Sequence, residues 1–265
     1  MATESDTLMA HPEDAGPVDL TAVGLQIVEQ AASVGLDLRL IGGVAIALRC
    51  RPEHASVGSS RRYGDIDLCG LSKSSRDYGQ LLEGMGYEPS LPFNQLNAAV
   101  YQRFDHSEHP VHLDLFLDSL RMCHELPFRE RLTLGRHTLT PADLLLSKLQ
   151  IVELNEKDIR DVHTLLAQYE LGESDDDNCI CVDRIAVVCA REWGWWRTAR
   201  GTLEKCVGPG YQWPGDQMRR ERVARSLTSL IEAIDDVPKS MKWRTRARIG
   251  ERVRWYELPE DPTRA

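Results

Sequence analysis

Gly64-Asp65-Ile66-Asp67-Leu68-Cys69 alternates acidic and aliphatic side chains, the pattern of a β-strand with one buried face. Side chains two residues apart on a strand share a face, so Asp65 and Asp67 project together while Ile66 and Leu68 enter the core. Two adjacent carboxylates repel one another, and a hard divalent cation with oxygen ligands removes that cost. The segment therefore predicts a sheet with a Mg²⁺ (or Mn²⁺) site on one face.

A second segment, residues 111–117, shows the same alternation and carries a third acid. Its four aliphatic positions share one face, whereas His112, Asp114 and Phe116 share the other. If this strand lies beside the first, about 4.8 Å away, Asp114 completes a three-carboxylate site for two metal ions about 3.5–4 Å apart. We expect His112 to pack near this site rather than to bind metal.

A glycine pair separates a short apolar strand, residues 36–41, from the start of a helix, residues 44–50. Glycines there let backbone N–H groups approach a phosphate closely, and the helix dipole favours an anion. Taken alone, Gly42 and Gly43 are better explained as a tight turn. The phosphate-binding interpretation gains support only from the acids that follow.

The remaining pattern predicts an α/β region followed by helices. Further strands are expected at 98–104 and 111–117, with one more short strand pair at 132–139; helices are expected at 20–35, 74–86, 140–154 and 157–169, and after an acidic linker at 172–178. Thr140-Pro141-Ala142-Asp143 combines an N-cap residue with a proline and an acid in the first turn, which is typical of a helix start.

We expect three parts: a disordered leader at 1–18, an α/β domain carrying the carboxylates at 19–138, and a helical domain at 139–265. The leader is acidic and lacks an apolar core, so it does not resemble a signal peptide. No apolar run approaches the roughly 20 residues that span a bilayer. Seven scattered cysteines then favour reduced thiols in the cytoplasm, and the Cys179-x-Cys181 pair lacks the further ligands of a zinc site.

The net charge of −9 is unevenly distributed. Residues 191–265 hold 16 Lys/Arg and 11 Asp/Glu, a net of +5, which leaves −14 for residues 1–190. Within the basic part, residues 239–254 carry seven basic side chains and one acid, with Trp243 inside the segment and Trp255 directly after it. This segment fits either RNA binding by stacking and charge, or a basic helix that packs its tryptophans inward.

The ordered set of Gly42-Gly43, Asp65-x-Asp67 and Asp114 resembles the DNA polymerase β-like nucleotidyltransferase superfamily over residues 38–118. Together with Arg62, Lys148 and Lys157-Asp158-Ile159-Arg160-Asp161, it is similar to the AbiEii-type toxin nucleotidyltransferases over residues 38–166. The resemblance implies an enzyme of a toxin–antitoxin system, with an NTP substrate and an antitoxin protein as partner. Gly43 replaces the usual serine, which removes one side-chain contact to phosphate, and Tyr63 replaces a usual serine or threonine. These departures bear on the position and preference of the nucleotide.

The resemblance also assigns roles to residues outside the acids. Lys148 would face the triphosphate, although it also fits a surface lysine lying along Leu144 and Ile151. Arg62, with Arg61 as competitor, would contact a phosphate. Asp158 and Asp161 would orient Lys148 or the metal site, or would simply be acids at a helix N-terminus.

The acceptor stays open at this point. An RNA end such as that of tRNA, a protein hydroxyl and an aminoglycoside all suit the same metal site. Two other classes also remain: a non-catalytic nucleotide- or RNA-binding module, and a phosphodiesterase or nuclease that uses the same carboxylates. Products separate the last of these, since a nuclease shortens RNA whereas a transferase consumes triphosphate and releases pyrophosphate.

Overall fold

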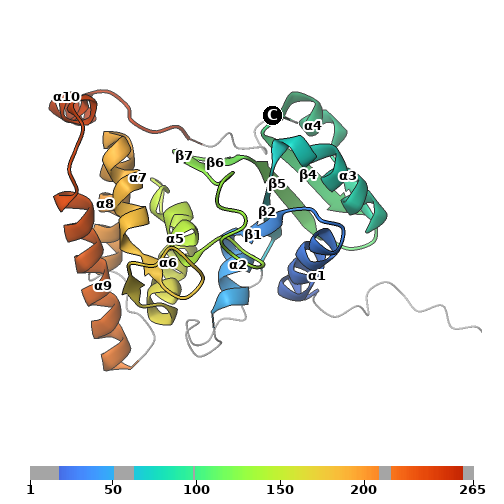
Figure 1. Ribbon diagram of the computed structural model, residues 1–265, viewed down its shortest axis with the longest axis horizontal. Coiled ribbons are helices and arrows are strands. Elements are labelled where there is room, and N and C mark those ends of the chain that lie inside the picture. Colours follow the sequence, from blue (N-terminus) through green and yellow to red (C-terminus); the bar gives the residue numbers. More distant parts are fainter. Residues whose placement is uncertain (1–17, 51–62, 98, 209–215, 259–265) are drawn as a thin grey trace, which may run out of the picture.

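The computed structural model describes residues 18–50, 63–97, 99–208 and 216–258 as a mixed α/β part followed by a helical part (Figure 1). The expected fold class is therefore confirmed. Within these residues, no helix is both long enough and apolar enough to cross a membrane. The expected leader at 1–18 lies outside the described residues except for Val18.

A five-stranded mixed sheet, in the order β1-β2-β5-β4-β3, forms the α/β part. Its strands are β1 (Leu38–Ile41), β2 (Asp65–Gly70), β3 (Tyr87–Pro89), β4 (Tyr101–His106) and β5 (His112–Leu117). The central pair β2 and β5 is parallel, and the other neighbours are antiparallel. The two acid-bearing strands are thus direct neighbours, as expected.

Four helices accompany the sheet: α1 (Leu20–Ser33), α2 (Gly42–Arg49), α3 (Ser75–Gly84) and α4 (Leu91–Asn97). The sequence pattern predicted α1, α2 and α3 but neither the short helix α4 nor the three-residue strand β3. The predicted strand pair at 132–139 is wrong. That segment forms turns, and only Thr138 makes an isolated parallel bridge, to Leu40. A hairpin of β6 (Ser119–Arg121) and β7 (Glu125–Pro127) occurs earlier instead.

The helical part contains α5 (Pro141–Leu149), α6 (Glu156–Gln168), α7 (Val182–Arg191), α8 (Trp193–Val207), α9 (Gln217–Asp236) and α10 (Met241–Ile249), with β8 (Leu171–Gly172) and β9 (Ile180–Cys181) as a small parallel pair. Helix α5 starts as predicted, with the Asp143 backbone N–H donating to the Thr140 hydroxyl, but it ends at Leu149 rather than near 154. Helix α6 begins with a capping box between Asn155 and Asp158.

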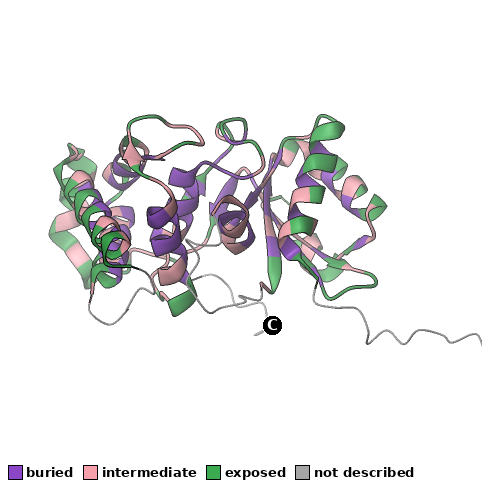
Figure 2. Ribbon diagram, turned by 90° about the horizontal axis from the view of Figure 1, so that it is seen from below, coloured by how far each residue is buried: buried purple, intermediate pink, exposed green. Residues whose placement is uncertain are grey.

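The core runs without interruption from the sheet into the helical part (Figure 2). Helix α5 lies at this junction, packed against α2 on the sheet side and α8 on the other. Every residue of α5 is buried except Lys148. This one side chain lines a cleft between the two parts. The division at 138/139 stays a prediction, since one hydrophobic cluster spans it.

Candidate active site

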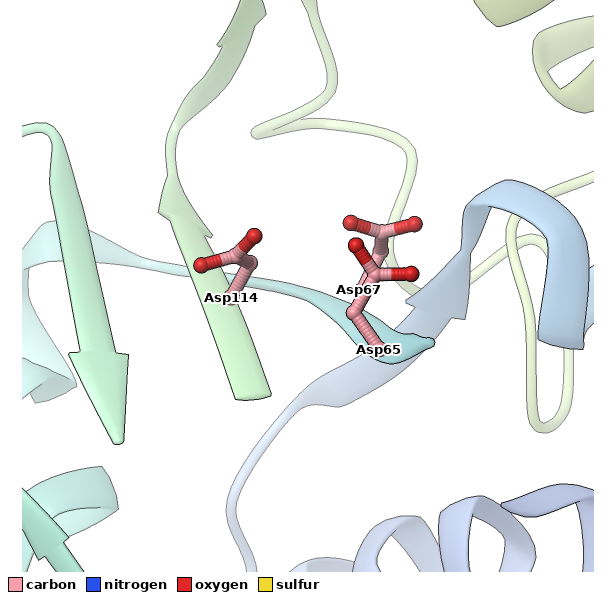
Figure 3. Close-up of side chains that lie close together, drawn as sticks. All are labelled: Asp65, Asp67 and Asp114. Carbon is pink, nitrogen blue, oxygen red and sulfur yellow. The ribbon is translucent and has the colours of Figure 1, made fainter. Parts of the chain in front are cut away.

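Three carboxylates converge at the centre of the sheet (Figure 3). Asp65 and Asp67 project from β2, and Asp114 stands directly opposite Asp67 in the parallel register with β5. One oxygen from each lies within 4.8 Å of the others. In the part of the chain that the structure describes, no other His, Cys, Asp and Glu side chains form such a group. Alternation along β2 and β5 produces this arrangement, because the aliphatic residues between the acids are buried beneath.

The carboxylates experience the repulsion that the sequence pattern implied. Burial raises the pKa of Asp67 to about 8, and the negative charges of Asp65 and Asp114 add to this shift. Burial also raises the pKa of Asp114, although hydrogen bonds with Tyr101 and Arg103 oppose the shift. A divalent cation would stabilise the ionised form of all three groups. The all-oxygen donor set fits Mg²⁺ or Mn²⁺.

The backbone of Gly42 approaches this cluster closely. Gly42 has a φ of +72°, and a Cβ atom placed on it would lie 2.0 Å from Asp67 Oδ2. Only glycine fits this position, for both conformational and steric reasons. Gly42 and Gly43 form the first turn of α2, where no side chain caps the backbone N–H groups, and both line the cleft. The pair is thus the start of the helix itself, rather than a loop before it.

Lys148 lies between two buried acids. Its Nζ is 2.9 Å from Asp161 Oδ2 and 3.2 Å from Asp158 Oδ1, and its side chain is 12% exposed. Burial lowers the pKa of Lys148, but the ion pairs with Asp161 and Asp158 outweigh it, so the pKa is raised overall. The positive charge of Lys148 also lowers the pKa of Asp67. The alternative of a surface lysine lying along Leu144 and Ile151 is wrong.

A few further residues were singled out from the sequence. Arg62 and its competitor Arg61 lie outside the described residues. His112 stands on the exposed end of β5, where its Nδ1 pairs with the Asp105 carboxylate. It lies opposite Asp65 in the register of β2 and β5, so its position beside the carboxylate group is as expected, and its lack of a metal-binding role stays a prediction. Cys179 and Cys181 are free thiols whose Sγ atoms approach backbone carbonyls.

The basic C-terminal segment uses its tryptophans for packing. Trp243 Nε1 donates to the Cys189 carbonyl at 3.3 Å, and Trp255 Nε1 donates to the Thr198 hydroxyl at 3.1 Å. Trp243 also makes an edge contact with Trp196. Because both rings pack against α7 and α8, the inward-packing interpretation fits, and these two rings do not form an exposed stacking platform.

The sequence pattern missed one wall of the cleft. Arg103 on β4 stands opposite Asp114, and their Nε–Oδ1 distance is 3.2 Å. Its guanidinium lies over the rings of Phe93 and Tyr101. Both rings and Phe116 line the same cleft, which has a volume of about 1150 Å³. Phe116 shares a face with Asp114 in the sequence pattern. The partners on β4 depend on a register that alternation alone does not fix.

No family model matches the chain, and no curated protein matches it. Among solved structures, a lincomycin-bound lincosamide antibiotic adenylyltransferase, LnuA, is similar to 57% of this chain over 98% of its own, at 15% identity and a TM-score of 0.39. The antibiotic-resistance factor ANT(2'')-Ia is similar to 82% of this chain over 97% of its own, at 13% identity and a TM-score of 0.37. An antigenic nucleotidyltransferase-like protein from Paracoccidioides brasiliensis is similar to 85% of this chain over 96% of its own, at 16% identity and a TM-score of 0.43.

Proposed function

We propose that this protein is a metal-dependent nucleotidyltransferase, which moves a nucleoside monophosphate from an NTP to an acceptor hydroxyl and releases pyrophosphate. The observation that carries the proposal is the group Asp65, Asp67 and Asp114 on adjacent parallel strands. The backbone of Gly42, which approaches Asp67 closely, and the partly buried Lys148 lie at the same cleft. Together they would provide metal ligands, hydrogen-bond donors to the phosphates and space for an attacking hydroxyl.

In this proposal Asp65 and Asp67 would hold both metal ions, and Asp114 would hold the one nearer the acceptor. When bound, these ions neutralise the triphosphate and lower the pKa of the attacking hydroxyl. The backbone N–H groups of Gly42 and Gly43 donate to the phosphate oxygens at the start of α2. Lys148, oriented by Asp158 and Asp161, adds positive charge on the same side.

The chemistry is a single displacement at the α-phosphorus. The acceptor oxygen forms a bond to this phosphorus, the bond from the α-phosphorus to the oxygen bridging to the β-phosphate breaks, and pyrophosphate leaves. The Asp114 carboxylate accepts the hydroxyl proton. The site therefore performs mainly positioning and charge stabilisation, as expected for phosphoryl-group chemistry.

We further propose a cytoplasmic enzyme of the AbiEii toxin type, with tRNA as acceptor and an antitoxin protein as partner. The support for this finer proposal is the sequence arrangement of the acids followed by Lys148 and residues 157–161. The structure adds that Lys148, Asp158 and Asp161 form one buried ionic group at the cleft. Arg62 keeps its proposed role as a phosphate contact.

The test is incubation with each α-labelled NTP, Mg²⁺ and total tRNA, in parallel with the Asp65→Ala/Asp67→Ala variant. The expected result is labelled tRNA and released pyrophosphate, both lost in the double variant. Pyrophosphate without labelled RNA would keep the transferase and replace the acceptor. Shortened RNA without triphosphate consumption would indicate a nuclease and overturn the proposal.

A further inference from the structure

A group of aromatic side chains stands beside the third carboxylate, on the side away from Gly42. In the antiparallel register of β4 and β5, Arg103 faces Asp114 and Tyr101 faces Phe116. The rings of Tyr101 and Phe116 stack at 4.8 Å with an interplanar angle of 5°. Phe93 of α4 contacts the edge of Tyr101 at 4.9 Å. We call Phe93, Leu96, Tyr101, Arg103 and Phe116 the aromatic wall.

The wall is held in place by the chain around it. Strand β3 ends at Pro89, and helix α4 continues along the edge of β4, in the same part of the molecule (Figure 1). Beyond the end of β3, Asn94 of this helix makes the hydrogen bonds to β4 that a further strand residue would make. Its side chain accepts from the Arg103 N–H at 2.8 Å and donates to the Arg103 carbonyl at 3.0 Å. Phe93 is thereby positioned over the Arg103 guanidinium, 4.4 Å from it.

The wall leaves apolar and π surface open to the cleft. Phe93, Tyr101 and Phe116 are only half-buried, and Leu96 is 87% exposed. Large apolar side chains gathered at a cleft mark a binding surface. Aromatic rings with a stacked guanidinium are the surface on which planar rings bind, and this contact tolerates different rings because each has a π-face.

Charge restricts what this surface accepts. Within the wall Arg103 is the one charged residue, and its neighbouring acid is Asp114. In the proposed function the negative charge of Asp114 is shared with a metal ion, so it neutralises the Arg103 guanidinium less. An incoming ligand at the wall therefore experiences the positive charge of Arg103. A polycationic ligand would be repelled there, whereas an uncharged or anionic one would not.

Space allows a second molecule beside the triphosphate. The cleft volume of about 1150 Å³ exceeds the roughly 300–1,000 Å³ of ordinary single-ligand sites. The backbone N–H groups that would bind phosphate lie at the Gly42–Gly43 end of the cleft. Asp114 lies between that end and the aromatic wall. A hydroxyl that attacks opposite the leaving pyrophosphate would approach from the wall side.

We propose that the aromatic wall is the acceptor subsite, and that it selects an acceptor carrying a planar, uncharged ring next to the reacting hydroxyl, as a terminal nucleoside does, over a polycationic sugar. This inference rests on the proposed function. It deepens that function by assigning the acceptor class to named residues.

The test measures the KM of acceptor and triphosphate separately, with a short synthetic RNA bearing a free 3′ hydroxyl and, in parallel, the aminoglycoside tobramycin. Phe93→Leu and Phe116→Leu remove the π surface but keep apolar volume. We expect each to raise the KM for RNA by about tenfold, equivalent to about 1.4 kcal/mol and within the range for base stacking, without a change in the KM for the triphosphate. Tyr169→Leu, a half-buried aromatic residue outside the cleft, is the matched control and leaves both unchanged.

Leu96→Ala tests the wall without a folding defect, because this side chain is too exposed to contribute to the core. We expect it to raise the KM for RNA by about threefold, through loss of apolar contact. Efficient labelling of tobramycin instead of RNA would overturn the inference while the transferase stands. So would a rise in the KM for the triphosphate alone, which would assign the wall to the nucleotide. Absence of any triphosphate turnover would overturn the proposed function, and the inference with it.

Discussion

Replacing Gly42 by alanine should damage the metal site far more than the fold. Two separate penalties apply at this position. The positive φ of +72° costs an L-residue about 1–2 kcal/mol. In addition, the new Cβ would lie 2.0 Å from Asp67 Oδ2 and 2.9 Å from its Cγ, so the carboxylate must withdraw by about 1 Å to reach even a tight contact.

The second penalty acts on chemistry. A displacement of about 1 Å in a positioned group reduces turnover by about 100-fold. We therefore expect Gly42→Ala to lower the unfolding free energy by about 1–2 kcal/mol from the backbone alone, and to reduce pyrophosphate release by about 100-fold. Urea unfolding and a pyrophosphate-release assay with Mg²⁺ measure the two effects.

Gly35 provides the matched control. It has nearly the same backbone conformation, with a φ of +76°, but a Cβ there would meet nothing within 4 Å. Gly35→Ala should therefore show the backbone penalty and retain wild-type turnover. If Gly42→Ala loses no more activity than Gly35→Ala, the proposed contact between α2 and Asp67 has no role in the site.

Three further changes separate stability from chemistry. Burial raises the pKa of Asp67 from 3.8 to about 8 in the metal-free protein, so the folded state binds this proton more tightly than the unfolded state. The stability of the metal-free protein should therefore fall as the pH rises from about 4 to 8. Thermal melts in EDTA should show a weaker dependence of stability on pH for Asp67→Asn. Lys148→Met leaves Asp158 and the 3% exposed Asp161 without their cation, so urea unfolding should show a loss of about 3–5 kcal/mol, and a loss below about 1 kcal/mol would contradict the buried ion pairs. Asp143 of α5 is 1% exposed and pairs with Arg131 and Arg184, so Asp143→Ala should lower the unfolding free energy by a similar amount. Its Mn²⁺ affinity should stay unchanged, which titration of the folded variant checks.

Local alternation in the sequence predicted the carboxylate-bearing face of the sheet. Asp65 and Asp67 share a face because strand geometry requires it, and Asp114 sits among aliphatic residues that had to be buried. The same pattern misled at 132–139. Leu132 and Leu139 are buried there, but the chain reaches the core through turns rather than strands.

The periodicity of the sequence could not predict the pairing register between strands or the presence of very short elements. Arg103 meets Asp114 only because β4 and β5 pair with that particular register, and periodicity along one strand contains no information about its neighbour. Helix α4 has seven residues, too few for a helical period to emerge. Similarly, helical spacing places Lys148 on α5 but does not reveal that Asp161 lies within 2.9 Å.

The central claim is that three carboxylates hold divalent metal with a triphosphate. The most direct measurement counts Mn²⁺ ions bound per chain by electron paramagnetic resonance, with and without a non-hydrolysable NTP analogue. We predict about two ions per chain with the analogue, and loss of this binding in Asp67→Asn but not in Asp143→Ala. Absence of bound Mn²⁺ in the wild type, or unchanged binding in Asp67→Asn, would contradict the claim.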